Sequence, residues 1–451
     1  MKGDMTQGST SKILITFAIP LLLGNLFQQL YNTTDAIIVG RFIGKNALAA
    51  VGVANPIMSV AIFFIFGICI GTSVLMSQIF GAGEYEELKK EVSTALIAGI
   101  IFTIALSIVC VLLSRWILVL TGTPEEILDD AEIFLKIIFS GLIFSFLYNF
   151  YSSSLRAIGD SRTPLFFLII SCVLNAILCV VLIKVFNFGV AGSAIATVTA
   201  QGVSSLLCIA YVYTKIPLLS LKRNEFIMDK SLLKKTIQYS WVTALQQTCI
   251  YAGKLLVQGV VNPFGTNAIA AYNSVTRIDG FVIAGGDSFS SSVATYSAQN
   301  KGAGKMDRII ESFTKSLAIM AVYSSIIGLI IFFGAQSIVE LFVSGDEKEV
   351  IQIGIGYLKG ISVFYILSNV NNVFQGLFRG LGKLSITFYG TFIQIIIRVI
   401  LSYILAPHFG IISVCYAIAA GWFVMLIYEI LSYRKAFKGS AIEESTGETI
   451  R

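Results

Sequence analysis

The chain has 451 residues, of which 56% are hydrophobic and only 13% are charged, with a mean hydropathy of +0.82. Soluble proteins carry about a quarter charged residues, so this composition excludes a soluble globular domain and indicates a polytopic membrane protein. The net charge of +6 needs no nucleic-acid partner, because most basic residues gather in the connections between apolar runs. None of the seven cysteines lies in a Cys-x-x-Cys motif, and disulfide or zinc sites therefore have little support.

Apolar runs long enough to cross a hydrocarbon core of about 30 Å occur along the whole chain. They predict twelve transmembrane helices, at roughly 13–40, 46–80, 92–120, 131–157, 163–187, 190–214, 236–261, 267–299, 310–340, 350–378, 384–406 and 410–433. Residues 1–12 are polar, and no cleavage site of small residues follows a brief apolar core. The first span is therefore expected to be a retained helix and not a signal peptide.

Lys and Arg residues are distributed unevenly over the predicted connections. With residues 1–12 in the cytoplasm, the cytoplasmic segments hold 20 of them and the opposite loops hold 5. The positive-inside rule then places both termini in the cytoplasm of a multi-pass protein of the cell (plasma) membrane. The same basic segments suit contact with anionic membrane lipid.

The first predicted span carries a stripe of polar residues. Steps of 3, 4 and 3 residues place Asn25, Gln28, Asn32 and Asp35 on one helical face. An ionisable side chain inside the membrane is costly and marks a candidate functional site. We interpret Asp35 as a carboxyl group that binds a proton or Na⁺; an interhelical hydrogen-bond clamp is the alternative. Upstream, Pro20 removes a backbone donor and favours a bend in this helix.

Polar residues four positions apart recur in the fifth and sixth spans. Asn175 and Cys179 share one helical face, and a second face carries Ser193, Thr197 and Gln201. Carbonyl and hydroxyl oxygens beside a carboxylate would suit a hard monovalent cation. Hydrogen bonds that hold helices together are the commoner use of such pairs, and spacing alone does not separate the two interpretations.

The second half carries intramembrane charges of both signs. The seventh span places Tyr251 and Lys254 on one face, and the eighth span carries Asp279 and Asp287. The eleventh span carries Arg398. Because buried charges usually require a partner, we expect the two cations to form salt bridges with the two aspartates. A proton relay or a substrate contact is the alternative.

The two halves of the chain repeat each other. GKNALAA at 44–50 returns as GTNAIAA at 265–271, and QIFGAG at 78–83 returns as QNKGAG at 299–304, both 221 residues later. Each half holds an even number of spans, so the repeats enter the membrane from the same side and are parallel. The predicted divisions are a cytoplasmic N-terminus at 1–12, a six-helix lobe at 13–214, a basic cytoplasmic linker at 215–235, a second six-helix lobe at 236–433 and a cytoplasmic tail at 434–451.

Enzyme chemistry has little support. A Ser-His-Asp arrangement would have to use His408, the sole histidine. GAGK at 302–305 is like the end of a phosphate-binding loop, but Met306 follows the lysine and the Walker pattern is not met. Without an ATP site, work on a solute must come from an ion gradient, and no cofactor is expected.

Four segments together resemble the multidrug and toxic compound extrusion (MATE) transporters. They are YNTTDAIIVG at 31–40, NALAAVG at 46–52, QxxGAG at 78–83 and RAxGD at 156–160. The likeness covers about 13–433, including the echoes in the second half. It implies two six-helix lobes around a central cavity, which export cationic, amphipathic compounds in exchange for H⁺ or Na⁺.

On the matching positions, the resemblance implies that Asp35 is the ion-coupling acid. It assigns Asn175 and Thr197 to the first-lobe cation site, and Pro20 to the proline associated with helix bending. Cys179 stands where the family usually has a second acid. The predicted site therefore has one carboxylate, which favours H⁺ and puts Na⁺ binding in doubt. The candidate residues for contact with substrate in the cavity are Gln28, Asn32, Tyr251, Lys254, Asp287 and Arg398.

The sequence thus predicts a monomeric antiporter that works by alternating access and binds small organic cations. A flippase for lipid-linked sugars, from the same superfamily, is the alternative within transport. It would need more cationic residues in its cavity than Lys254 and Arg398. A non-transporting receptor or scaffold is the alternative from another class, and it would not need Asp35 and its polar stripe.

Overall fold

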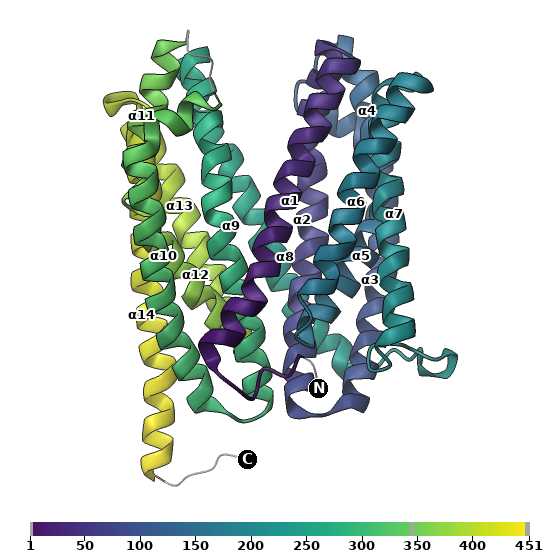
Figure 1. The fold of residues 1–451 in the computed structure, drawn as a ribbon, viewed down its shortest axis with the longest axis vertical. Helices are drawn as coiled ribbons and strands as arrows, with labels where there is room; N and C mark the ends of the chain where they lie inside the picture. The colour runs from purple at the N-terminus through teal and green to yellow at the C-terminus, as the bar shows by residue number, and fades with distance from the viewer. Residues whose placement is uncertain (1–2, 343–346, 447–451) are drawn as a thin grey trace. The chain divides into compact units, whose positions relative to one another are not determined.

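The structure of the chain is a computed structural model that describes residues 3–342 and 347–446. The backbone alone is described for Asn32, Ala36, Lys45 and 438–446. Throughout the described residues the secondary structure is helical and contains no strand (Figure 1). The predicted all-α class is therefore confirmed.

Apolar stretches of the first half form helices because a helix satisfies its backbone groups internally, as hydrocarbon demands. These helices are α1 (Thr10–Phe42), α2 (Lys45–Ala82), α3 (Tyr85–Leu120), α4 (Glu125–Ser140), α5 (Leu142–Ala157), α6 (Arg162–Val180) and α7 (Gly189–Lys215). A π-helical turn, Val181–Val185, extends α6. The predicted span at 131–157 is a bent pair, because α4 and α5 meet at an angle of 45°.

The second half repeats this order. Its helices are α8 (Lys230–Val261), α9 (Thr266–Gly302), α10 (Met306–Glu340), α11 (Lys348–Ser362), α12 (Tyr365–Gly380), α13 (Leu384–Phe409) and α14 (Ser413–Thr446). Again the fourth span is a bent pair, with 49° between α11 and α12. Each predicted span coincides with one helix or one bent pair. Among the described residues, eight helices are long and apolar enough to cross a membrane, or up to ten if each bent pair is one span.

The helices gather into two compact units. The first comprises Met1–Thr248 and Ala294–Ile309, and the second comprises Cys249–Val293 and Ile310–Arg451. The helices α8, α9 and α10 therefore belong partly to each unit. The first part of α8 belongs to the first unit because it contacts α2 there. The Thr243 hydroxyl of α8 donates to the carbonyl oxygen of Gly67 in α2 at 2.6 Å.

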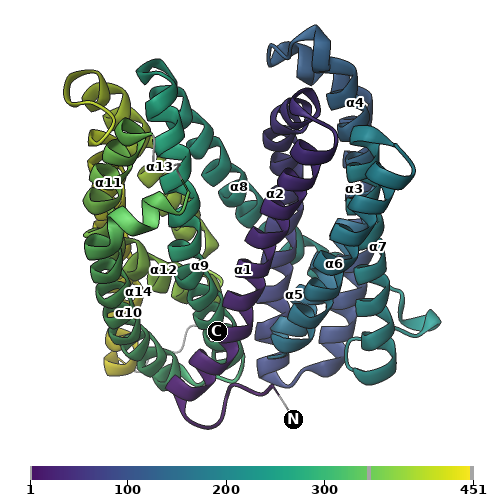
Figure 2. The same ribbon diagram turned by 45° about the horizontal axis from the view of Figure 1, so that its top comes forward.

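The core of the first unit lies among α2, α4, α5 and α7. Phe139, Phe146 and Phe150 are almost completely buried there, and the last two rings lie 5.6 Å apart. Beside this core, α1 packs along α6 (Figure 2). This packing matters because α1 and α6 both carry the polar residues that the sequence singles out.

The repeated Gln-x-x-Gly motif packs against its own copy in the first unit. A Cβ atom at Gly81, near the end of α2, would lie 1.9 Å from the carbonyl oxygen of Gln299 in α9. Reciprocally, a Cβ atom at Gly302 would lie 1.9 Å from the carbonyl oxygen of Gln78. Only glycine permits backbones to approach so closely, which explains why both repeats carry the motif.

Residues 3–9 are fastened to the first unit ahead of α1. The Met5 amide donates to Gln299 Oε1 at 2.9 Å, and Arg308 Nη2 donates to the Gly8 carbonyl oxygen at 3.0 Å. Both partners lie at the α9–α10 connection. The N-terminal segment therefore ties the start of α1 to that connection.

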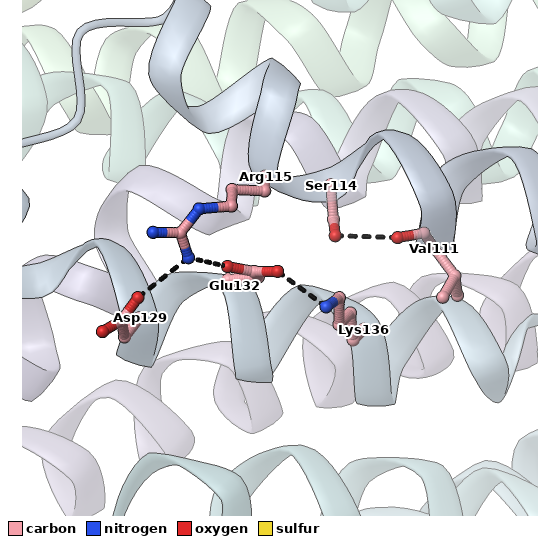
Figure 3. A network of polar contacts seen from close by, with 6 residues as sticks. All are labelled: Val111, Ser114, Arg115, Asp129, Glu132 and Lys136. Atoms are coloured by element: carbon pink, nitrogen blue, oxygen red, sulfur yellow. Dashed lines mark hydrogen bonds and ion pairs between the residues drawn. The ribbon is translucent and has the colours of Figure 1, made fainter.

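Ion pairs join the end of α3 to α4 (Figure 3). Arg115 Nη1 lies 2.9 Å from Asp129 Oδ1 and 2.5 Å from Glu132 Oε2, and Lys136 Nζ lies 2.6 Å from Glu132 Oε1. Arg115, Asp129 and Lys136 are largely exposed to solvent, which screens their charges, whereas Glu132 is largely buried. The network therefore orients this corner more than it stabilises it.

The linker between α7 and α8 is docked on α3. The Ser93 hydroxyl donates to the carbonyl oxygen of Ile227 and accepts from its amide, both at 2.8 Å. Glu225 accepts from the Lys222 amide and from Lys89, and these bonds lower the pKa of its carboxyl.

Asp229 ends the linker and caps the start of α8. It accepts from the amide of Leu232 at 3.0 Å and from that of Ser231 at 2.8 Å, and hydrogen bonds to these two residues lower its pKa. A carboxylate near a helix N-terminus also interacts favourably with the helix dipole. The second half of the linker is therefore held by two ionised carboxylates.

Acid should loosen this linker. Because the folded pKa values of Glu225 and Asp229 are lowered, their contribution to stability is complete above the ordinary values of about 4.3 and 3.9. It is lost as the pH falls through the lowered values. Hydrogen exchange at the Ile227 amide, corrected for intrinsic pH dependence, should accelerate in that window, and Glu225→Gln should reduce the response. A corrected exchange rate of the Ile227 amide that does not change with pH in the wild type would contradict this expectation.

Candidate ion-coupling site

Asp35 lies in α1 of the first unit, which packs on α6 and α7. Its Oδ1 accepts from Ser193 Oγ at 3.1 Å and from the Cys179 thiol at 3.5 Å. The side chain is half-buried, and among the described residues no cationic nitrogen lies within 4.0 Å of it. Asp35 is thus held by neutral donors, so it can change charge without breaking an ion pair.

A second polar layer lies one helical turn away. Thr197 Oγ1 accepts from Asn175 Nδ2 and from the Tyr31 hydroxyl, both at 3.2 Å. Each of these three residues lies four positions from a member of the Asp35 layer on the same helix. The pairs are Tyr31 with Asp35, Asn175 with Cys179, and Thr197 with Ser193. The four-residue steps seen in the sequence therefore converge from three helices on one site. The π-turn of α6 begins two residues after Cys179, and such turns are frequent at functional sites.

Ser193 and Tyr31 complete the site; the sequence places Ser193 on the polar face with Thr197 and Gln201, but it assigns Tyr31 no role. Both signals are present, because Ser193 is four residues before Thr197 and Tyr31 is four residues before Asp35. What the sequence lacks is the packing that turns these hydroxyls toward their partners.

Other predicted residues of α1 lie apart from this network. Gln28 is exposed and forms no hydrogen bond with Asp35. Pro20 is buried inside α1, which continues through it as one helix. The Asn32 side chain lies outside the described residues.

In the second unit, the predicted salt bridges of the two aspartates are absent from the described residues. Asp279 accepts from the Tyr365 hydroxyl, and Asp287 Oδ1 accepts from Asn372 Nδ2 at 3.3 Å. The salt-bridge prediction is therefore wrong for this conformation. The physical reason is that neutral donors on α12 take the positions beside both acids.

Lys254 and Arg398 are left without carboxylate partners within 4.0 Å in the described chain. Lys254 Nζ lies 5.4 Å from the centre of the Tyr251 ring, a cation–π contact. Arg398 Nη2 lies against α8, where a Cβ atom at Gly253 would be 2.9 Å away. Its Nε and Nη2 atoms are buried without an acceptor.

A protein-family model described as MatE matches the chain twice, over residues 20–181 and 243–404. The two matches together cover more than half of the chain, and they begin 223 residues apart, in keeping with the internal repeat. The chain belongs to the MatE family. It is therefore a multi-pass membrane transporter and not an enzyme.

Individual relatives agree with the MatE assignment. The chain is 30% identical over 382 residues to the probable multidrug resistance protein YpnP of Bacillus subtilis, which covers 84% of the chain and 85% of that protein. It is 24% identical over 399 residues to the probable multidrug resistance protein NorM of Thermotoga maritima, with coverages of 85% and 83%.

Solved structures share the fold of this MatE chain. A crystal structure of MATE in complex with MaL6 matches with a TM-score of 0.91 at 22% identity, over 97% of this chain and 99% of that one. A MOP superfamily transporter from Pyrococcus furiosus matches with a TM-score of 0.90 at 22% identity, over 97% and 98%. The predicted two-lobe helical fold class is confirmed.

Residue 179 differs from the expectation that the sequence resemblance raises. The resemblance leads one to expect a second acid there, and the structure shows a thiol that donates to Asp35. A neutral donor thus replaces a second carboxylate. Among the described residues, no group of three or more His, Cys, Asp or Glu side chains is arranged to hold a metal ion.

Proposed function

We propose that this MatE protein is a secondary antiporter that exports cationic, amphipathic organic compounds in exchange for H⁺. Relatives support export: YpnP and NorM are named probable multidrug resistance proteins, and MepA of Staphylococcus aureus is named a multidrug export protein. We further propose that it acts as a monomer in the plasma membrane. The excess of Lys and Arg on one side of the predicted spans favours cytoplasmic termini.

The observation that carries the proposal is a single carboxyl group held by neutral donors. A proton needs only one oxygen of Asp35. Sodium needs several oxygen ligands, but Thr197 Oγ1 already accepts two hydrogen bonds, which occupy its lone pairs. The sulfur of Cys179 is also a soft ligand, poorly suited to a hard cation. The site therefore favours H⁺ over Na⁺.

Protonation of Asp35 would change the contacts between helices. Hydrogen bonds to a carboxylate are stronger than those to a neutral acid, so proton binding weakens the bonds from Ser193 on α7 and Cys179 on α6. A substrate that binds preferentially to the deprotonated conformation is then released on protonation. Coupling requires this difference in affinity, and it is reciprocal between proton and substrate.

Everted membrane vesicles test the proposal directly. With the interior made acid, a fluorescent organic cation should accumulate in vesicles that contain the protein, and collapse of the pH gradient should release it. An imposed Na⁺ gradient alone should drive no accumulation. Accumulation driven by Na⁺ and indifferent to pH would replace H⁺ by Na⁺ as the coupling ion, and no accumulation in either case would count against export of organic cations.

A flippase for lipid-linked sugars is the second candidate, because Lys254 and Arg398 have no carboxylate partner within 4.0 Å in the described chain. Such cations suit an anionic phosphate group. Movement of a fluorescent, phosphate-bearing lipid across proteoliposomes, absent from the Arg398→Met variant, would favour this function. Organic-cation export without lipid movement would favour the antiporter.

A further inference from the structure

Glu429 is a completely buried acid in α14 of the second unit, with 0% of its surface exposed. It interrupts the apolar run FVMLIYEIL at 423–431, and α12 and α13 pack against its helix. An acid at such a position is costly and rarely kept without a use. The coupling described above does not use it.

The surroundings of Glu429 satisfy only one of its oxygens. Gln375 Nε2 of α12 donates to Oε1, while Oε2 is buried without a hydrogen-bond partner. Gly390 of α13 leaves the space beside the carboxyl, since a Cβ atom there would lie 3.5 Å from Oε1 and 3.5 Å from Gln375 Nε2. The carboxyl thus meets one amide and an otherwise uncharged pocket.

No cation compensates this acid in the described chain, where no Lys or Arg nitrogen lies within 4.0 Å of it. Titratable residues also lie on α14 and on the helices packed against it, and those closest to this level in sequence are Tyr428, Tyr433, Arg434 and Lys435 of α14, Glu311 and Lys315 of α10, Arg379 of α12, Lys383 and Tyr389 around the start of α13, and Tyr357 and Lys359 of α11. An ionised carboxylate that is buried without an ion pair is strongly unfavourable. These surroundings therefore favour the protonated, neutral form of Glu429.

The internal repeat shows that packing does not require an acid here. The residue 221 positions earlier is Cys208, and the residue 223 positions before Gln375 is Ser152. Both are buried in the first unit. The first half fills the equivalent place with small neutral side chains, so Glu429 is a property of the second half alone.

A groove of about 630 Å³ lies between the start of α13 and residues 428–436 of α14; Glu429 does not line it, but its chain neighbour Tyr428 does. Its polar lining consists of Lys383, Tyr428, Ser432 and Lys435. Tyr428 precedes Glu429 in the chain. A Cβ atom at Gly390 would lie 3.5 Å from Tyr428 Cδ1, as it would from Glu429 Oε1. Lys383 and Lys435 give the groove positive charge, which favours an ionised carboxylate nearby.

We propose that Glu429 is a second proton-binding site of the transport cycle, loaded and unloaded through this groove. In the unloading step the O–H bond of the carboxylic acid breaks and its proton passes to water in the groove; the reverse step reloads it. The inference rests on the proposed exchange of substrate for H⁺. It adds one proton to the one assigned to Asp35.

Infrared difference spectra of the purified protein between pH steps test this site without transport. One component of the carbonyl band of protonated carboxylic acids should titrate in the wild type and be lost from Glu429→Gln and from Glu429→Cys, which copies the first repeat, while the component that Asp35 contributes remains. Glu340→Gln is the matched control, because Glu340 also accepts from a glutamine, Gln336 at 2.9 Å, but is exposed. It should keep the band. Difference spectra of both Glu429 variants that equal the wild-type spectrum, or a Glu429 component that never titrates while the protein is folded, would overturn the proposal.

Transport assays then measure how many protons are exchanged for each substrate molecule. Proteoliposomes with Glu429→Gln should move one proton fewer for each substrate than the wild type, and an unchanged ratio would also overturn the proposal. Failure of the antiport scheme is distinguishable, because it would appear as proton-independent export in the wild type. The infrared titration would be unaffected by that result.

Discussion

Asp35→Asn is expected to abolish proton-driven export while the protein still inserts and folds. The amide keeps the shape of the side chain and its hydrogen-bond capacity toward Ser193, but it cannot bind a proton. The coupling between linked sites is typically a factor of about 5 to 150 in affinity, and this factor should be lost. Drug accumulation in cells should rise to the level of cells without the transporter.

The matched control for this variant is Thr33→Val, two residues away in the same helix. Thr33 is exposed, and its hydroxyl donates to the carbonyl oxygen of Gln29 within α1 at 2.9 Å. Thr33→Val should therefore export like the wild type. Wild-type export by Asp35→Asn, or substrate affinity that still varies with pH as in the wild type, would show that Asp35 is a structural clamp.

Gly81→Ala should destabilise the protein strongly for so small a change. The new methyl group would lie 1.9 Å from the carbonyl oxygen of Gln299, and a backbone atom cannot turn aside as a side chain can. Overpacking typically costs about 1–3 kcal/mol of folding free energy, and this site belongs at or above the upper end. The loss of folded protein after heating, measured by size-exclusion chromatography, should move to lower temperature.

Gly52→Ala is the control in the same helix. A Cβ atom at Gly52 meets nothing within 4 Å, so alanine there should be neutral, or stabilising by up to about 1 kcal/mol through its higher helix propensity. Gly302→Ala should reproduce the Gly81→Ala effect, because the two glycines pack reciprocally. Equal thermal stability of the Gly81 and Gly52 variants would contradict the close crossing of α2 and α9.

The helices and the repeat were accessible from the sequence because both depend on short-range pattern. A run of apolar residues in hydrocarbon has one main way to satisfy its backbone, and each of the twelve predicted spans coincides with a helix or a bent pair. The bends themselves were not accessible. The span at 131–157 breaks at Gly141, where a Cβ atom would lie 2.5 Å from the Val198 side chain of α7, and that contact exists only after folding.

Glu429 can be recognised as a candidate site from the sequence. A lone acid in an apolar run marks a candidate site by the same rule that singles out Asp35. Burial and the unpaired Oε2 atom then separate it from an acid that merely faces water.

Helical periodicity alone predicts which residues of α1, α6 and α7 share a face, since residues four positions apart point in nearly the same direction from one helix. How those faces meet depends on the packing of the folded chain. Ser193 reaches Asp35 across 158 residues of chain, and no local pattern encodes such a pairing. The same limit explains the salt bridges predicted for Lys254 and Arg398: opposite charges in one unit permit many pairings, and side-chain packing selects neutral donors for both aspartates instead.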